Sequence, residues 1–289
     1  MSEVSDRAAR YLRLLPSLYG DEMNPQVYSA AYNLSCIEFL PAASVPVIAA
    51  LVLIHGGGWV GGVDDNNLDS WIAQRLALSG VVVYSIDYRL DNQVAWPAML
   101  QDTQTAIRWA RSQTGNSIPV GALGTSAGGH IALMAGTQTT TLINQATDPN
   151  SEATSLHGYN SQPDFVVSIS GPGDLVMLSR QLSPPNHNLN PYINKLIAGV
   201  PPGGIASMEA LSPINLLSAT MPPTFLLYGT GDLSVPIEQA NELWTAFQAI
   251  RSGPDNLTVY TGMHILDGTT LTQRELYMAI IAGWVGGLK

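Results

Sequence analysis

Residues 120–133 hold a serine in a setting that suits a nucleophile. They read VGALGTSAGGHIAL, with Gly124, Ser126 and Gly128 forming a G-x-S-x-G pattern between an apolar run and a stretch of small residues. A strand-to-helix turn of this kind exposes the hydroxyl, in a backbone conformation that costs about 1–3 kcal/mol. The pattern predicts Ser126 as the nucleophile of an acyl-transfer reaction, and the Ala127 amide as a donor at the positive end of a helix.

A second glycine cluster follows an apolar run nearer the N-terminus. Residues 53–59 read LIHGGGW. Acyl transfer builds negative charge on the former carbonyl oxygen, and fixed backbone amides are suited to stabilise it. Glycine permits the close approach that such donors need. We expect Gly57 and Gly58 to form the oxyanion hole with Ala127, with the choice between the two glycines left open, and we expect His55 to orient this loop through hydrogen bonds.

A serine nucleophile needs a general base, and the histidines that follow Ser126 are the candidates. The order nucleophile, acid, histidine is expected when a G-x-S-x-G turn is present. His264 follows an apolar run and precedes the last helical stretch, whereas His157 and His187 lie in polar and proline-rich segments. The sequence therefore predicts His264 as the base.

The acid partner of the base is expected in the loop after the preceding strand. That loop reads GTGDLSVP and contains Asp232. Asp174 and Asp267 are the alternatives, but Asp174 is better explained as a cap or turn residue and Asp267 stands only three residues beyond His264. We predict a triad of Ser126, Asp232 and His264.

Short apolar runs alternate with longer helical patterns along most of the chain. This alternation indicates βαβ units and a mostly parallel sheet flanked by helices, an α/β fold. The expected strands are 47–54, 81–86, 118–123, 165–169, 224–228 and 257–260, and the expected helices are 67–78, 97–111, 127–135, 238–250 and 271–285. The first 20 residues have the pattern of a surface helix.

Two segments depart from this alternation. Residues 138–163 are polar and are expected to form a surface excursion, and residues 172–223 are rich in proline. Long loops within a compact domain are usually functional or disordered, and we interpret 172–223 as a cap-like insertion with short helices at 192–198 and 207–211. The chain as a whole, 1–289, is predicted to be one domain. Trp59 and Met177 are candidate substrate-binding residues.

The composition narrows the classes of partner. The 289-residue chain has 46% hydrophobic residues, 12% charged residues and a net charge of −10. The negative charge argues against nucleic-acid binding and against anionic membrane surfaces, and no apolar run is long enough for a membrane span. We expect no cofactor and no metal, a small-molecule ester as the partner, and a cytoplasmic location, and we consider a homodimer as a candidate assembly.

Several stretches resemble a known group of enzymes. HGGGW at 55–59, DYRL at 87–90, GTSAGGHIAL at 124–133 and GTGDLSVP at 229–236 resemble α/β-hydrolase-fold carboxylesterases, as does the helical stretch 97–111. The group includes hormone-sensitive-lipase-like esterases, feruloyl and acetyl-xylan esterase-like hydrolases, and kynurenine formamidases. The histidine after the two glycines, His130, makes the chain more similar to the feruloyl-esterase-like and formamidase branch. The chain departs from the common pattern after His264, where Ile-Leu-Asp stands in place of Gly-Phe.

This resemblance implies an α/β-hydrolase fold and a serine hydrolase that cleaves small carboxylic esters through an acyl-enzyme. Hydrolysis of N-formylkynurenine needs the same triad and stays open as an alternative. Acyl transfer to an acceptor other than water, or ligand binding without hydrolysis, also stays open.

Overall fold

The computed structural model describes residues 25–62, 67–115, 117–137, 154–182, 189–198 and 200–288. Within them, eight strands form one sheet in the order β1-β2-β4-β3-β5-β6-β7-β8. From β4 to β8 along this order the neighbouring strands are parallel, while β2 pairs antiparallel with β1 and with β4. The strands are β1 Pro25–Ser29, β2 Leu34–Phe39, β3 Ala49–Ile54, β4 Val81–Ile86, β5 Val120–Thr125, β6 Val166–Ile169, β7 Thr224–Gly229 and β8 Asn256–Tyr260.

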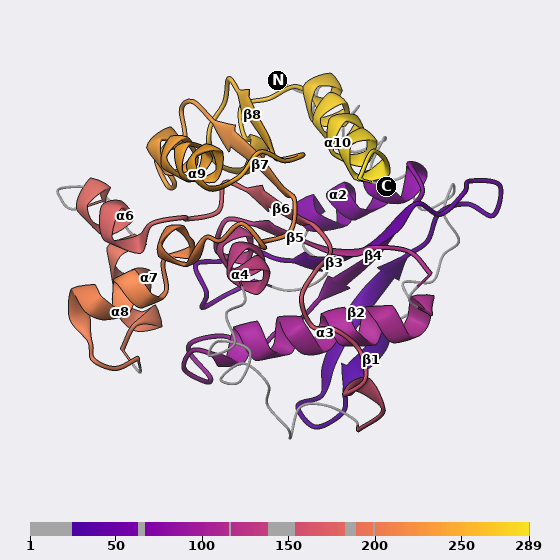
Figure 1. Ribbon diagram of the computed structural model, residues 1–289, viewed down its shortest axis with the longest axis horizontal. Helices are drawn as coiled ribbons and strands as arrows, with labels where there is room; N and C mark the ends of the chain where they lie inside the picture. The colour runs from indigo at the N-terminus through magenta and orange to yellow at the C-terminus, as the bar shows by residue number, and fades with distance from the viewer. Residues whose placement is uncertain are drawn as a thin grey trace, which may run out of the picture.

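Helices cover both faces of the sheet (Figure 1). The helices that follow strands are α2 Asn67–Leu78, α3 Ala98–Thr114, α4 Ala127–Gly136, α9 Ile237–Ile250 and α10 Leu271–Gly286. One apolar core lies between the sheet and α2 with α10, and the other lies between the sheet and α3, α4 and α9. Successive strand residues alternate between the two cores, as Leu51, Val52 and Leu53 do in β3. The predicted α/β-hydrolase-type sheet flanked by helices is confirmed.

The parallel strands and their helices lie close to the ranges expected from the sequence. The N-terminal hairpin of β1 and β2 was not among those expectations. Strand β2, with the sequence LSCIEF, mixes apolar and polar residues and is only partly buried, as is typical of an antiparallel strand near a sheet edge. A search for continuous apolar runs therefore overlooks it. The expected helix over the first 20 residues lies outside the described residues, as does most of the polar segment 138–163.

The segment between β6 and β7 contains short helices. They are α6 Leu175–Gln181, α7 Leu189–Leu196, α8 Gly204–Ala210 and the 3-10 turn η2 Pro213–Leu216. In Figure 1 the first three lie together at one side of the molecule, beyond the sheet. Gln239 of α9 anchors the start of this segment, because its side-chain oxygen accepts hydrogen bonds from the amides of Gly173 and Asp174.

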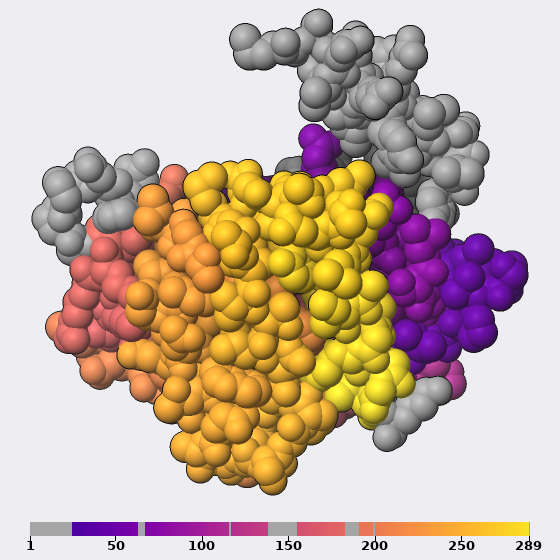
Figure 2. Space-filling model, turned by 90° about the horizontal axis from the view of Figure 1, so that it is seen from above, coloured from indigo at the N-terminus to yellow at the C-terminus, as the bar shows by residue number. Residues whose placement is uncertain are grey.

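Figure 2 views the molecule from another side, where the orange and yellow C-terminal part of the chain covers most of the visible face. This part contains α9 and α10. Among the described residues, no helix combines the length and the apolar character needed to cross a membrane.

Candidate active site

Ser126 occupies a sharp turn between β5 and α4. Its φ of 53° and ψ of −119° lie outside the regions that residues with side chains favour. The flanking glycines make the turn possible: a Cβ on Gly124 would stand 2.0 Å from the carbonyl oxygen of Gly128, and one on Gly128 would stand 2.0 Å from that of Ile54. The Ser126 amide donates to the carbonyl of Ile169 at 2.8 Å, which ties the turn to β6. The G-x-S-x-G spacing thus has a steric cause.

A chain of short hydrogen bonds joins the three residues of the predicted triad. Ser126 Oγ lies 2.8 Å from His264 Nε2, and His264 Nδ1 lies 2.7 Å from Asp232 Oδ2. In this geometry a neutral imidazole can donate from Nδ1 to the carboxylate and accept the serine proton at Nε2. The three side chains, far apart in sequence, come from the loops after β5, β7 and β8.

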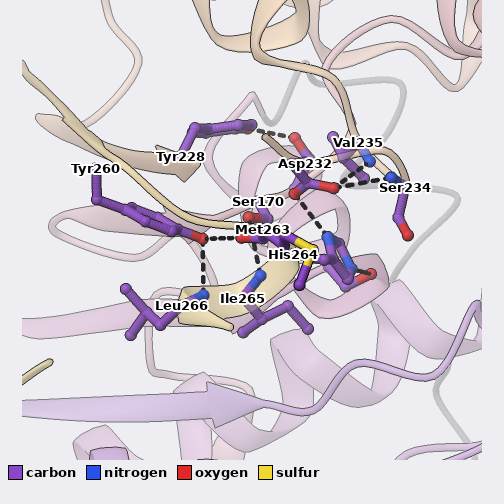
Figure 3. Close-up of polar contacts among 12 residues, drawn as sticks. Ser170, Tyr228, Asp232, Ser234, Val235, Tyr260, Met263, His264, Ile265 and Leu266 are labelled. Carbon is purple, nitrogen blue, oxygen red and sulfur yellow. Dashed lines mark hydrogen bonds and ion pairs between the residues drawn. The ribbon is translucent and has the colours of Figure 1, made fainter. Parts of the chain in front are cut away.

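The loop after β7 fixes the Asp232 carboxylate. Its Oδ1 accepts hydrogen bonds from the amides of Ser234 and Val235, both at 2.8 Å, so that Oδ2 is left to face His264 (Figure 3). The side chain of Asp232 is fully buried, whereas a quarter of the His264 side chain is exposed. The Asp232 carboxylate is thus fixed behind an imidazole that is partly open to solvent.

Neither alternative acid contacts the imidazole. Asp174 caps helix α6, where its Oδ1 accepts from the amide of Met177 at 2.9 Å. Asp267 accepts from the adjacent Gly268 amide, and its own main chain closes the loop through hydrogen bonds with Met263 and His264. Of the other histidines considered, His157 is exposed and His187 lies outside the described residues.

The loop after β8 carries His264 and is strained. Ile265 has φ 48° and ψ 59°, and Leu266 has φ 63°. The left-handed region costs a residue with a side chain roughly 1–2 kcal/mol, and it is least favourable for β-branched residues such as isoleucine. The Tyr260 hydroxyl donates to the carbonyl of Met263 at 2.8 Å and accepts from the amide of Leu266 at 2.7 Å (Figure 3). Two such bonds, each contributing about 0.5–1.5 kcal/mol, are comparable to this strain.

The glycine-rich loop after β3 lies against the nucleophile. A Cβ on Gly56 would stand 3.3 Å from the Cβ of Ser126. Gly57 and Gly58 both have positive φ, at 125° and 60°. Within the described residues, the amides of Gly57, Gly58 and Ala127 donate no hydrogen bond to the protein. These three donors, expected from the sequence to stabilise an oxyanion, are therefore free to serve a ligand.

His55 and Tyr88 support this loop from below. His55 is buried, its Nδ1 lies 2.7 Å from the carbonyl oxygen of Gly56, and its ring stacks on Tyr88 at 4.3 Å between centroids. The Tyr88 hydroxyl donates to the main-chain carbonyl of His55 at 2.9 Å. Burial lowers the pKa of His55, which favours the neutral ring. His55 thus hydrogen-bonds the loop, in line with the orienting role expected for it.

His130 links the glycine loop to the segment between β6 and β7. It lies one turn beyond Ser126 in α4, fully buried, with Nδ1 3.2 Å from the indole nitrogen of Trp59 and Nε2 2.7 Å from the carbonyl oxygen of Leu211. The two partners assign the tautomer, because Trp59 can only donate and the carbonyl can only accept. Burial lowers the pKa of His130 to about 4, which keeps the ring neutral.

The structure places Trp59, one of the two predicted substrate-binding residues, inside the protein. Its side chain is 1% exposed and its only polar hydrogen is given to His130. The indole therefore supports the glycine loop from inside the protein. Met177, the other predicted substrate-binding residue, lines a shallow groove of about 600 Å³ formed with η2 and α9. None of the six residues expected in the triad and the oxyanion hole lines that groove.

Tyr192 was overlooked by sequence reasoning. Its ring carbons would stand 3.3 Å from a Cβ on Gly58, so this residue of α7 lies directly over the glycine loop. No local pattern distinguishes it, because it occurs in a proline-rich stretch whose packing depends on distant elements. Tyr260 was overlooked because its role depends on hydrogen bonds to the loop that follows its strand, which no local pattern reveals.

Comparisons with known proteins agree with the fold and with the family resemblance. The chain is 28% identical over 250 residues to esterase LipC of Mycobacterium tuberculosis, covering 84% of this chain and 57% of LipC. The chain spans about half the length of the curated relatives it matches.

Two solved structures share the fold. One is a truncated carbohydrate esterase from gut microbiota, with a TM-score of 0.70, 23% identity, and coverage of 91% of this chain and 94% of that one. The other is esterase 2 of Thermogutta terrifontis phosphonylated by sarin, with a TM-score of 0.69, 23% identity, and coverage of 90% and 95%.

A family model matches most of the chain, from residue 39 to residue 247. The matched range contains the glycine loop, the serine turn and the Asp232 loop, and it ends before His264. The resemblance inferred from the motifs is confirmed, and this protein belongs to the BD-FAE family.

Proposed function

We propose that this protein is a serine hydrolase that cleaves small carboxylic esters through an acyl-enzyme on Ser126. The observation that carries the proposal is the hydrogen-bonded chain from Ser126 through His264 to Asp232. The unpaired amides of Gly57, Gly58 and Ala127 beside the serine support it further. The relatives reported above carry esterase names, and none of them specifically supports the formamidase alternative.

The proposed reaction has two halves. His264 takes the proton of Ser126 as the hydroxyl oxygen attacks the ester carbonyl, and the amides of Gly57, Gly58 and Ala127 stabilise the negative oxygen. His264 then gives the proton to the departing alcohol oxygen, which leaves the acyl group on Ser126. Water, deprotonated by the same imidazole, attacks the acyl-enzyme and releases the acid. Asp232 holds the tautomer of His264 and stabilises the imidazolium without taking the proton.

We further propose that the segment 172–223 acts as a cap within a single hydrolase domain. Support comes from two contacts: the Tyr192 ring lies over Gly58, and the Leu211 carbonyl accepts from His130, which bonds Trp59 of the glycine loop. Side chains of the cap would then limit the size of the ester. Absence of nucleic-acid binding, a homodimer and a cytoplasmic location stay predictions from the sequence.

A panel of p-nitrophenyl and alkyl esters tests the proposed activity and measures the pocket. Acyl length is varied at a fixed alcohol, and the alcohol is varied at a fixed acyl group. We expect turnover that is highest for short, soluble esters and falls as the acyl chain lengthens. The Ser126→Ala variant serves as the matched blank. A wild-type rate equal to that blank on every ester would reject esterase activity.

A further inference from the structure

The Tyr260 hydroxyl bridges the main chain on the two sides of His264. Tyr260 is the last residue of β8 and is buried. Its oxygen donates to the Met263 carbonyl, one residue before the histidine, and accepts from the Leu266 amide, two residues after it. One hydroxyl thus uses a donor and an acceptor function to close the backbone around the proposed base (Figure 3).

The bridged stretch would not hold this shape on local preference alone. Ile265 and Leu266 both have left-handed backbones, and neither is a glycine. A second contact on Ile265 is weak, since the Ser170 hydroxyl accepts from its amide at 3.4 Å. Without support, these two residues would relax toward negative φ, and the imidazole that precedes them would turn with the chain.

Position matters at this point because the imidazole has two partners at once. Its Nε2 must stay within reach of Ser126 and its Nδ1 within reach of Asp232, at the observed 2.8 and 2.7 Å. A displacement of about 1 Å can lower a catalysed rate by about 100-fold, because the reacting atoms leave their aligned geometry. Burial also raises the pKa of Tyr260, so its hydroxyl keeps the proton that it donates to Met263.

We propose that Tyr260 is a positioning residue for the base: its hydroxyl locks the strained Ile265–Leu266 backbone and thereby fixes the His264 imidazole between Ser126 and Asp232. The proposal rests on the hydrolase function proposed above. In this proposal Tyr260 does not contact substrate, and its hydroxyl affects the reaction only through His264.

The test is Tyr260→Phe, which removes one oxygen and keeps the buried ring. The matched control is Tyr28→Phe. Tyr28 is also a buried tyrosine whose hydroxyl donates to a main-chain carbonyl, that of Asp87, but it lies in β1 at the edge of the sheet. Both variants lose one hydroxyl in a buried site, and so both are expected to lose thermal stability.

Two readouts separate positioning from general stability. For Tyr260→Phe we expect kcat to fall by about 10- to 100-fold, with KM within about twofold of wild type. In the proton NMR spectrum, the downfield signal of the His264 Nδ1 hydrogen bonded to Asp232 should shift or broaden. Tyr28→Phe should change neither kcat nor this signal.

The proposal is overturned if folded Tyr260→Phe keeps both the wild-type kcat and the wild-type signal while losing only thermal stability. The NMR readout needs no substrate, so it still tests positioning if wild-type protein hydrolyses none of the esters. Absence of ester hydrolysis by the wild-type protein would reject the proposed function instead. The two failures are therefore distinguishable.

Discussion

On one side of Ser126 lies the glycine loop after β3, and on the other lie the loops after β7 and β8. Both sides use backbone in the left-handed region. The glycine loop adopts it at Gly57 and Gly58, where the absence of a Cβ makes it inexpensive, and also at Trp59, which has a φ of 65°. The histidine loop adopts it at Ile265 and Leu266, and the Tyr260 hydroxyl bonds the Met263 carbonyl before this pair and the Leu266 amide within it.

The two sides also differ in what supports them. Beneath the glycine loop are neutral, buried rings: His55 stacked on Tyr88, and Trp59 bonded to His130. In the acid loop, main-chain amides donate to Asp232, and in the base loop the Tyr260 hydroxyl donates to the Met263 carbonyl and accepts from the Leu266 amide. The glycines of the loop allow its amide donors to take their places locally. Alignment of the His264 imidazole depends instead on contacts between residues far apart in the sequence. The following changes test that difference.

The largest effect is expected on the base side. Asp232→Asn keeps the shape of the side chain but replaces the acceptor of the His264 Nδ1 proton by an amide, so the imidazole takes the wrong tautomer. We expect kcat to fall by about 10⁴-fold with the fold intact. Asp267→Asn is the matched control, because that carboxylate bonds only its neighbour Gly268 among the described residues. Equal loss in both variants would mean that Asp232 has no special role.

A smaller loss is expected on the glycine side. Gly57→Ala places a Cβ 2.0 Å from the Gly61 carbonyl oxygen at a φ of 125° that alanine does not adopt, so the loop must move. Loss of one oxyanion donor should lower kcat by about 10²–10³-fold.

The control for this change is Gly115→Ala. Gly115 also has a positive φ, 66°, but a Cβ there would meet nothing within 4 Å, and it caps the end of α3. We expect it to lower stability and leave kcat unchanged. If Gly57→Ala retained wild-type kcat, the amides of this loop would not be the donors.

The smallest effect concerns stability rather than rate. The pKa of His130 is lowered from about 6.5 to about 4, so between these pH values the unfolded chain binds a proton that the folded protein excludes. The free energy of unfolding should therefore fall as pH drops from 6.5 to 4, by on the order of 3 kcal/mol from this group. His130→Gln removes the titrating ring and should flatten this dependence, as measured by urea unfolding at pH 7 and pH 4.5. An unchanged dependence would contradict a buried neutral His130.

The contrast between the two sides explains what could be predicted from the sequence. The glycine loop and the serine turn are local patterns whose steric demands appear in the residue types, so Gly57, Gly58 and Ser126 could be selected directly. Predicting Asp232 and His264 required one further rule, namely that the acid follows one strand and the histidine follows the next. The strands of the parallel sheet were predictable because each is a continuous apolar run.

Other features depend on packing that a linear reading does not contain. Tyr260 and Tyr192 owe their importance to partners brought together by the fold. Trp59 follows a glycine loop and so suggested a substrate contact, but His130, far along the chain, turns its indole inward. Helix α6 was missed because the prolines around it obscure the helical pattern, although Asp174 was expected as a cap or turn residue and does cap it.

The most direct measurement of the central claim is to find where a fluorophosphonate attaches. The reagent is attacked only by a serine that has an aligned base and an oxyanion hole. We predict one adduct per chain, located on Ser126 by peptide mass spectrometry, and its loss in the Ser126→Ala and His264→Ala variants. No adduct, or an adduct on another residue that persists in both variants, would contradict the account.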